Sequence, residues 1–586
     1  MKTKLFSLAL IGLFCLTIQA QPFQREVQHN SDIYHDLNIE VIDDGSTDFI
    51  VASNIFDSTM TSSVVSLKRM DENGMIIWAK EYSDSSLQNA RVFDVANILG
   101  VVAITGSIDV GSTKRTFIAK IDAASGNVIN VNYYDIVGSS FNSTGLNIAY
   151  TDTDADNDGT TDPGFVVGGF VSSCYNLDNQ CSFNMGYVLR VDEFLNVIWT
   201  TEVDSLGTSG ANNDYDFINN ITETNNGFFL TGSATGITQQ GFERQGVLAL
   251  LIDHQGNSLW DKSYIYGNFR DVSVDAYYEA STGNIYMLSN YSSMHNFGIT
   301  VFDTSGNIIN SLSWVINSGY LDRYGFTLKE SVLSPDNLVV FGYNREEYWT
   351  NGAGDVKYGQ SNVFTYEFEK ATGNQVSIAY QYLNTHVEAP GDEYNFWNGQ
   401  MPLIYYPDMA TVLNLNSGSQ DDYITAGYQT PEGMPYTFAE ITRTSDKRNM
   451  CDNMNLTLSH TSISVYEIPV SSGLVTTTEG PMNFNDTAYS YTLTNCDGTM
   501  GVENNSINTG GLFPNPTNGE LTVFLNNNTI KSLAIYSVLG QKMKEINLNG
   551  TGSTTTLNVS DLQKGVYFIN IEDNLSKNQV LKFIKN

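Results

Sequence analysis

The sequence predicts an all-β protein built from repeated units, and two observations support this. Apolar and polar residues alternate along most of the chain between Gly and Asn turns, which is the pattern of strands and hairpins. A unit of strand, Asp turn and second strand also recurs, for example at 65–78 and 250–260. Each unit can bury its apolar face only against its neighbours. We therefore expect a ring of repeats, because 586 residues are too many for one compact core.

Residues 1–20 predict a signal peptide that is removed on export. Lys2 and Lys4 provide the basic end, Leu5–Ile18 the apolar run, and Ala20 the small residue before the cleavage site. The apolar run is too short for a stable membrane span, and no later stretch reaches the ~20 apolar residues that spanning needs. The mature chain is expected to begin at Gln21.

Residues 21–446 predict a seven-bladed β-propeller. The turn after the third strand of six units falls at Asp71, Asp122, Asp192, Asp253, Asp303 and Glu369. A seventh unit begins near Met409 and has only three strands. We expect Phe23–Val27 to supply its fourth strand, because a ring closed in this way leaves no exposed strand edge.

The repeated Asp and Trp residues are interpreted as structural. An Asp at the start of a turn accepts hydrogen bonds from the backbone ahead of it. Trp78, Trp199, Trp260 and Trp314 are expected to pack between blades, because an aromatic side chain buries a large area. The Asp-x-x-Gly-x-x-x-Trp pattern resembles the repeat of quinoprotein-type propellers and of related outer-membrane assembly propellers. The quinone enzymes of that group use adjacent cysteines, which this sequence lacks, so the resemblance implies the fold and no quinone.

One acidic loop, 152–162, is a candidate calcium site. Carboxylates at alternate positions and a Gly for the sharp bend are what a hard cation requires. Position twelve of a helix-loop-helix calcium motif would be Phe165 rather than Glu, so that motif does not apply. The Asp-x-Asp-x-Asp-Gly-x-x-Asp spacing resembles the calcium loops of integrin-type propellers. That resemblance implies these ligands: Asp154, Asp156, Asp158, Asp162 and the backbone carbonyl of Thr160. The alternative is a solvated acidic turn.

Residues 447–511, rich in Thr, Ser and Asn, predict a small β module, or a spacer pinned by Cys451 and Cys496, followed by a linker. Cleavage of the signal peptide leaves four cysteines, and an exported chain is expected to oxidise them in pairs. We predict a local disulfide between Cys174 and Cys181, and a second between Cys451 and Cys496 that holds the module. Four free, buried thiols are the alternative.

The last segment, 512–586, predicts a compact antiparallel β-sandwich from alternating strands and turns. It opens with Leu-Phe-Pro-Asn-Pro-Thr-Asn-Gly at 512–519 and ends with Lys-Phe-Ile-Lys-Asn at 582–586. Together these motifs resemble the type A C-terminal sorting domain of proteins exported by the type IX secretion system of Bacteroidetes. The residues that carry the resemblance are Pro514, Asn515, Pro516, Gly519, Tyr536, Gly540, Gly565 and Tyr567.

The sorting-domain resemblance implies a route and a partner. The protein would cross the inner membrane to the periplasm, and the type IX machinery would then move it to the outer cell surface or the medium. The alternative is an ordinary sandwich domain at the end of a secreted protein, because a fold alone does not establish a function.

The charge balance excludes some partners. Asp and Glu outnumber Lys and Arg by 64 to 29, a formal charge of -35. Such a chain repels nucleic acid and anionic membranes and favours divalent cations or basic partners.

Two classes of function are open for the ring. As a binding or adhesion module it would present variable loops to a glycan, peptide or matrix. Trp397, Tyr405 and Tyr406 are candidate stacking residues, and the alternative is that these aromatic side chains pack within their own loop. As an enzyme it would be a polysaccharide hydrolase or lyase, for which two carboxylates suffice. The six His residues show no triad or ligand spacing and no Gly-x-Ser-x-Gly occurs, so no catalytic residue is assigned and binding is favoured. The sequence does not identify the ligand or the oligomeric state.

Overall fold

A computed structural model gives the fold of the chain as two compact units, 1–497 and 498–586. It describes residues 23–586 apart from 30–34, 44–46, 58–61, 84–87, 99, 137–140, 173–182, 206–215, 238–242, 266–270, 292–295, 316–320, 332–333, 351–355, 383–410, 417–420, 430–437, 446–458, 463–465, 469, 483, 490, 496–509, 526–528, 538–540, 549–551 and 575–577. Every named element within these residues is a β-strand, as predicted. None of the described residues belongs to a helix that could cross a membrane.

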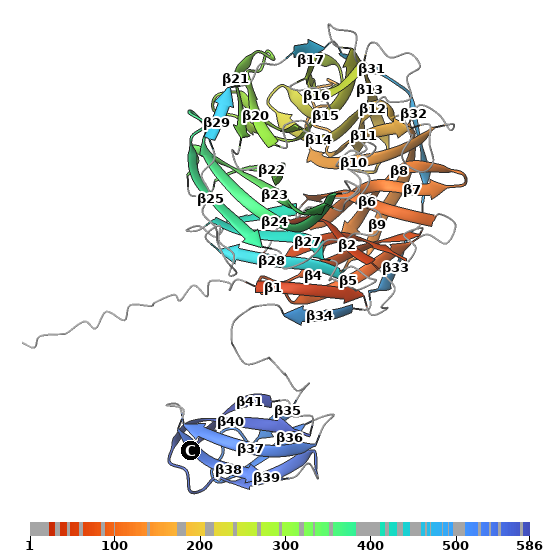
Figure 1. Cartoon of the computed structure of the whole chain (residues 1–586). Helices are drawn as coiled ribbons and strands as arrows, with labels where there is room; N and C mark the ends of the chain where they lie inside the picture. The colour runs from red at the N-terminus through yellow and green to blue at the C-terminus, as the bar shows by residue number, and fades with distance from the viewer. Residues whose placement is uncertain are drawn as a thin grey trace, which may run out of the picture. The chain divides into compact units, whose positions relative to one another are not determined.

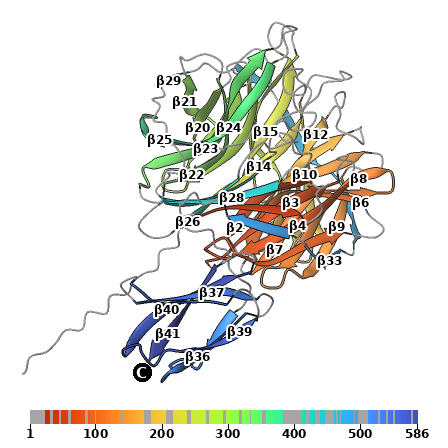
Figure 2. The same cartoon turned by 60° about the horizontal axis from the view of Figure 1, so that its bottom comes forward.

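Seven antiparallel sheets make up most of the first unit (Figures 1 and 2). Six of them are built on four strands that follow one another in the chain, and the seventh combines three such strands with β1. The first three sheets are β2 (His35–Asp43), β3 (Phe49–Phe56), β4 (Ser63–Met70) and β5 (Ile76–Ser83); β6 (Gln88–Ile98), β7 (Val101–Val110), β8 (Thr113–Asp122) and β9 (Val128–Ile136); and β10 (Asn142–Thr151), β11 (Gly164–Ser172), β12 (Phe183–Asp192) and β13 (Val197–Ser205). The next two are β14 (Phe217–Thr224), β15 (Gly227–Ile237), β16 (Glu243–Ile252) and β17 (Ser258–Ile265); and β18 (Asp271–Glu279), β19 (Asn284–Tyr291), β20 (Asn296–Phe302) and β21 (Ile308–Val315). The last two are β22 (Leu321–Glu330), β23 (Asn337–Thr350), β24 (Val356–Glu369) and β25 (Gln375–Tyr382); and β26 (Thr411–Asn416), β27 (Asp421–Gln429), β28 (Phe438–Ser445) and β1 (Phe23–His29).

The seventh sheet takes its fourth strand from the beginning of the described chain. Strand β1 pairs antiparallel with β28, from Phe23 opposite Arg443 to Val27 opposite Ala439. This pairing confirms the prediction for Phe23–Val27. The first strands of successive sheets also contact one another, from β2 through β6, β10, β14, β18 and β22 to β26, and β26 contacts β2 in turn. The first and last sheets therefore lie side by side.

A peripheral segment, 459–495, adds a fifth strand to six of the seven sheets, and we call it the belt. Its strands are β29 (Ser459–Ser462), β30 (Tyr466–Ile468), β31 (Val470–Leu474), β32 (Thr477–Pro481), β33 (Asn485–Ala488) and β34 (Tyr491–Asn495). They pair antiparallel with β21, β17, β13, β9, β5 and β1 respectively. The described strands of this segment therefore form no sheet of their own, unlike the small β module predicted within 447–511. Strands of three to five residues cannot bury a core of their own, but they can extend the edge of an existing sheet.

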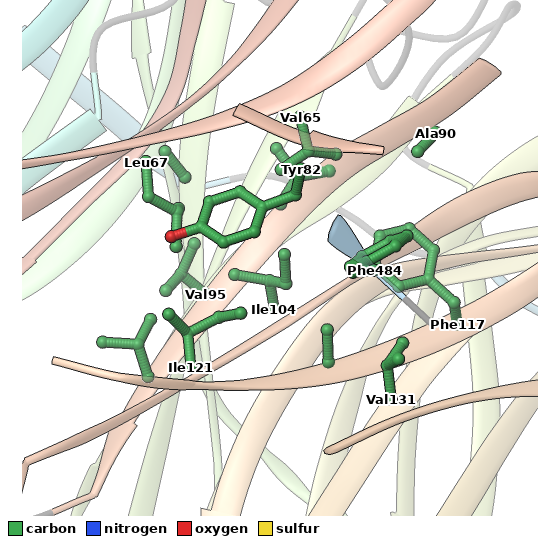
Figure 3. Packing of buried hydrophobic residues seen from close by; sticks show 14 of the residues in the cluster. Val65, Leu67, Tyr82, Ala90, Val95, Ile104, Phe117, Ile121, Val131 and Phe484 are labelled. Atoms are coloured by element: carbon green, nitrogen blue, oxygen red, sulfur yellow. The ribbon is translucent and has the colours of Figure 1, made fainter. Parts of the chain in front are cut away.

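Three belt side chains reach the core between sheets. Met482, Phe484 and Tyr489 are buried, and the Phe484 ring meets that of Phe117 edge-on, with centroids 5.5 Å apart (Figure 3). The Nζ of Lys68 lies 4.8 Å from the centroid of the Tyr489 ring. The belt is therefore held by side-chain packing as well as by strand pairing.

The repeated Asp and Trp have the structural roles predicted for them. The Asp71 carboxylate accepts hydrogen bonds from the backbone N–H of Asn73 (2.9 Å) and of Met75 (2.8 Å). The indole N–H of Trp199 donates to the backbone carbonyl of His254 in the turn of the next sheet, at 3.1 Å. Trp78 and Trp260 do the same to the carbonyls of Ala123 and Thr304. Trp314 is buried.

The second unit consists of two antiparallel sheets around a shared core. One sheet contains β35 (Gly510–Phe513), β36 (Glu520–Leu525) and β39 (Thr554–Asn558). The other, in spatial order, contains β38 (Lys542–Asn547), β37 (Ile530–Ser537), β40 (Gly565–Asp573) and β41 (Asn578–Lys585). Buried residues of both sheets, among them Val523, Ile535 and Ile569, form one cluster. This arrangement agrees with the predicted antiparallel sandwich.

Candidate functional sites

The acidic loop gathers three of its predicted ligands. It connects β10 to β11, and carboxylate oxygens of Asp154, Asp156 and Asp162 lie within 4.8 Å of one another. A backbone hydrogen bond from Asp162 N–H to the Thr153 carbonyl, 3.1 Å, closes the base of the loop. Three carboxylates this close repel one another. Backbone N–H groups of the loop offset part of this repulsion, because Gly159 donates to the Asp154 carboxylate and Ala155 to that of Asp162, both at 2.9 Å. Their oxygens are the donors that calcium prefers, so the residues fit that ion.

The other two predicted ligands bond to each other. The Asp158 carboxylate accepts from the backbone N–H of Thr160 at 2.8 Å and from its hydroxyl at 2.6 Å. These bonds lower the pKa of Asp158. Asp158 is not among the three gathered carboxylates.

The loop is anchored to two other hairpins. The Gln255 side chain, in the turn between β16 and β17, donates to the backbone carbonyl of Asp154 at 2.7 Å. The buried guanidinium of Arg190, on β12, donates to the carbonyls of Asp162 and of Val191, the latter at 2.7 Å. Burial lowers the pKa of Arg190 to about 10. A cation in the loop would therefore brace the third sheet against the fourth.

A second candidate site, which sequence reasoning missed, follows the first strands of the sheets. In six sheets the pairing register shifts along the first strand, and a polar residue stands directly after the shift. These residues are Glu40, Asp94, Asn147, Asn220, Asp275 and Thr327. Three of the six, Asp94, Asn147 and Asp275, are an Asp or Asn between two apolar residues, as in Phe93-Asp94-Val95, and this was the signal in the sequence.

Several of these polar side chains tie one sheet to the next. Asp94 Oδ2 accepts from the backbone N–H of Ile148 at 2.7 Å and from the Asn147 side chain at 2.6 Å. Asp275 Oδ2 likewise accepts from the backbone N–H of Leu328 and the hydroxyl of Thr327, both at 2.7 Å. Each carboxylate thus accepts a backbone hydrogen bond from the first strand of the next sheet.

Burial shifts the protonation of two of these carboxyls. It raises the pKa of Asp94 to about 7, although hydrogen bonds from Ile148 and Val95 oppose the shift. It raises the pKa of Glu40 well above the ordinary value, and the charge of Asp94 adds to the effect. The ammonium group of Lys329 acts in the opposite direction on both. A carboxyl that holds its proton near neutral pH can serve as a general acid.

In the second unit, the opening motif of the tail is bound to its last strand. The Asn515 side chain accepts from the backbone N–H of Ile584 at 2.9 Å and donates to the Lys582 carbonyl at 3.1 Å. The Thr517 N–H donates to the Ile584 carbonyl at 2.8 Å. Tyr567 is buried and stacks on Phe583 with centroids 5.6 Å apart. The two motifs that define the tail in the sequence therefore form one structure.

Several predicted site residues lie outside the described part of the chain. They are the signal peptide, the four cysteines Cys174, Cys181, Cys451 and Cys496, the aromatic residues Trp397, Tyr405 and Tyr406, and Gly540. Of the remaining predicted sorting residues, Pro514, Pro516 and Gly565 are exposed, and Gly519 and Tyr536 are half-buried.

Comparison with known proteins identifies the tail. Residues 511–586 match the family model described as a secretion system C-terminal sorting domain. This match supports the type IX sorting domain predicted from the motifs and indicates export to the cell surface or secretion. It also implies an interaction with the type IX secretion machinery.

Comparisons over most of the chain find only distant similarity. No curated protein matches. Among solved structures, a phage phi92 endosialidase is 10% identical, with 74% of this chain and 71% of that chain covered and a TM-score of 0.34. An extracellular domain from B. thetaiotaomicron is 8% identical, with 96% and 98% covered and a TM-score of 0.14. The BSP domain of a biofilm associated protein is 9% identical, with 96% and 90% covered and a TM-score of 0.12.

Proposed function

We propose that the protein is a type IX cargo with a type A sorting tail, whose first unit is a seven-bladed β-propeller that binds an extracellular glycan, peptide or matrix component. The propeller is supported by the order of contacts among the first strands, which runs from β2 to β26 and returns to β2. Export by the tail would bring this scaffold to the cell surface or the medium.

The structural role of two carboxylates on the first strands favours binding over catalysis. Asp94 and Asp275 each accept two hydrogen bonds from the next first strand. A carboxylate engaged in this way holds the scaffold together and is a poor acid or base for a substrate. The loops between strands then remain as the surface for a ligand, which is the usual division between scaffold and site.

A catalytic role is the second candidate, and the raised pKa of Glu40 favours it. A protonated carboxyl beside an ionised one is the pair that glycoside cleavage uses. A polysaccharide hydrolase or lyase would then use Glu40 as the acid.

A glycan array and a polysaccharide-degradation screen with the full chain separate the two roles. Binding without product release, unchanged by Glu40→Gln, supports the binding role. Product release that Glu40→Gln abolishes would establish the enzyme instead. Neither binding nor turnover across peptide, matrix and glycan panels would overturn both.

We also propose that calcium occupies the loop between β10 and β11. The gathered Asp154, Asp156 and Asp162 would hold it, with Asp158 and the Thr160 carbonyl as the further ligands that the loop spacing suggests. The ion would supply charge compensation and rigidity, and no chemical step is assigned to it.

The predicted disulfide between Cys451 and Cys496 would close the belt. Strands β28 and β34 both pair with β1, and Ile441 and Asn495 stand opposite the same residue, Arg25. The two strands are therefore parallel and about 10 Å apart, at two strand spacings. Cys496 directly follows β34, and Cys451 follows the end of β28 by six residues. This placement supports the Cys451–Cys496 pair, which we propose together with Cys174–Cys181.

A further inference from the structure

The sorting tail presents a row of four side chains across its larger sheet. The register places Lys542 opposite Tyr536, Tyr536 opposite Phe568, and Phe568 opposite Lys582. The row therefore crosses all four strands, with two aromatic rings in the middle and a lysine at each edge. Three strand spacings separate the two lysine positions, which is about 14 Å.

This row lies on the face of the sheet that points away from the core. Residues alternate between the two faces of a strand, and Ile535 and Ile569, the neighbours of Tyr536 and Phe568, are buried in the core cluster. Phe568 keeps 37% of its surface exposed. One row further along, Val566 pairs with Ile584, which is 38% exposed. The outer face thus carries an apolar strip between two lysines.

Positive charge in the tail is confined to this sheet. Residues 511–586 contain seven lysines and five carboxylates, a formal charge of +2, whereas the whole chain carries -35. Five of the lysines lie within β37, β38 and β41, and Lys564 and Lys577 directly precede β40 and β41. The strands of the other sheet contain no lysine. The tail is therefore the basic part of an acidic protein. Lys542 and Lys582 lie at the two ends of the apolar strip, whereas Lys585 is buried and Lys544 bonds the Asn558 carbonyl next to the other sheet.

We propose that this face, made by Lys542, Tyr536, Phe568, Lys582 and Ile584, is the surface by which the type IX secretion machinery recognises the tail. The proposal rests on the sorting function of the tail and adds where and how the partner binds. Charge complementarity requires a protein surface with an apolar strip bordered by carboxylates about 14 Å apart. Lys542 bonds Glu545 at 2.9 Å, but both side chains are exposed, and such a pair costs little to replace.

The first test measures export of the full chain in the producing bacterium. The double variant Lys542→Gln and Lys582→Gln removes two positive charges from exposed positions. The matched control, Thr522→Glu and Thr556→Glu, lowers the net charge by the same amount on the three-stranded sheet, where these hydroxyls lie 3.0 Å apart. We expect the lysine variant to reduce the exported fraction about tenfold, through loss of steering and of two charged contacts. The threonine variant is expected to export normally.

The outcomes separate this proposal from the sorting function itself. If deletion of 511–586 stops export and the lysine variant is exported like the wild type, the proposed face is wrong and the sorting domain stands. If the deleted chain is still exported, the sorting function fails as well. Equal melting temperatures of the purified variants establish that reduced export does not reflect unfolding.

A second test identifies the partner in the cell. A photo-cross-linking phenylalanine analogue is placed at Phe568, and at Phe513, which is 55% exposed on the other sheet, as the control. Cross-linking from position 568 alone to an identified protein of the secretion machinery supports the proposal. Cross-linking to anionic lipid, or equally from both positions, would overturn it.

Discussion

At the scale of single residues, a glycine in one sheet makes room for a tryptophan of the sheet before it. Gly256 has φ +83°, and a methyl group on it would lie 2.8 Å from the Trp199 ring. Gly126 and Gly306 stand in the same way against Trp78 and Trp260. The repeated Gly therefore serves both the backbone of its own turn and the packing between sheets.

Replacing Gly256 by Ala should destabilise the protein for both reasons. The left-handed backbone costs about 1–2 kcal/mol, and displacement of the Trp199 ring adds about 1–3 kcal/mol of overpacking. The control is Gly111→Ala, at φ +65°, where an added methyl group meets open space. Urea unfolding of both variants measures the difference. Equal losses would show that the tryptophan contact contributes nothing.

Calcium should raise the melting temperature of the wild-type protein. An ion at about a hundred times its dissociation constant adds about 2.7 kcal/mol to the free energy of unfolding. Changing Asp154, Asp156 and Asp162 together to Asn should abolish the rise and the calorimetric binding signal. Asp158→Asn should weaken binding less than Asp156→Asn, because Asp158 is not among the three gathered carboxylates. Identical melting temperatures with calcium and with EDTA would refute the site.

The buried Asp94 makes stability depend on pH. Its pKa is raised from 3.8 to about 7 in the folded protein, so the folded state holds a proton that the unfolded state releases. The free energy of unfolding therefore falls as pH rises between about 4 and 7, by up to about 1.4 kcal/mol for each pH unit. Glu40, also raised, contributes in the same direction, and Asp275 and Lys329 act on both groups.

Asp94→Asn should flatten this dependence, because Asn keeps an acceptor for Ile148 and does not titrate. Urea midpoints at pH 5 and pH 8 measure it, and the wild-type protein should have the higher midpoint at pH 5. Asp303 offers the contrast, since hydrogen bonds from Asn307 lower its pKa, so Asp303→Asn should not reduce the slope. The same slope in wild type and Asp94→Asn would contradict the assignment.

At the scale of elements, the belt protects sheet edges that would otherwise be exposed. A fourth strand at the rim of a sheet presents unpaired backbone groups that can recruit other chains. In six sheets a belt strand of three to five residues occupies that edge. Because so few residues are involved, the belt depends on its buried anchors.

Phe484→Ala should loosen the belt. Removal of a buried aromatic ring typically costs about 3–5 kcal/mol, and here the lost contact is with Phe117. The control is Leu474→Ala, a belt residue that is 59% exposed. Limited proteolysis should cut the Phe484 variant within 459–495 faster than the wild type, and the Leu474 variant at the wild-type rate. Unchanged cutting of both would show that strand pairing alone holds the belt.

At the scale of the whole molecule, the proposed Cys451–Cys496 bond would enclose the belt in a covalently closed loop. Closing a loop of this length is worth roughly 4 kcal/mol in the chain-entropy model. Peptide mapping of the non-reduced protein should find the Cys451–Cys496 pair, and Cys451→Ser should lower the melting temperature. Free thiols at both positions would exclude this disulfide.

The sequence predicted the parts of the fold that local chemistry determines. The turn at Asp71, the strand at Phe23–Val27 and the sorting tail each have a pattern of their own. The belt does not, because strands as short as Tyr466–Ile468 show no clear alternation and acquire their structure from the edge they join. The partners of Asp94 belong to a different sheet, so a single polar residue in an apolar strand gave no indication of its role.

The position of β1 between β28 and β34 affects how the chain can fold during and after its synthesis. At 5–20 residues per second, a ribosome makes Ala439 roughly 20–80 s after it makes Val27, the residue with which it pairs. Strand β1 must therefore wait for its partner β28 until about three quarters of the chain has been made. A chaperone that shields this segment should matter more than one acting later, and chains stalled before β28 should be unable to mature.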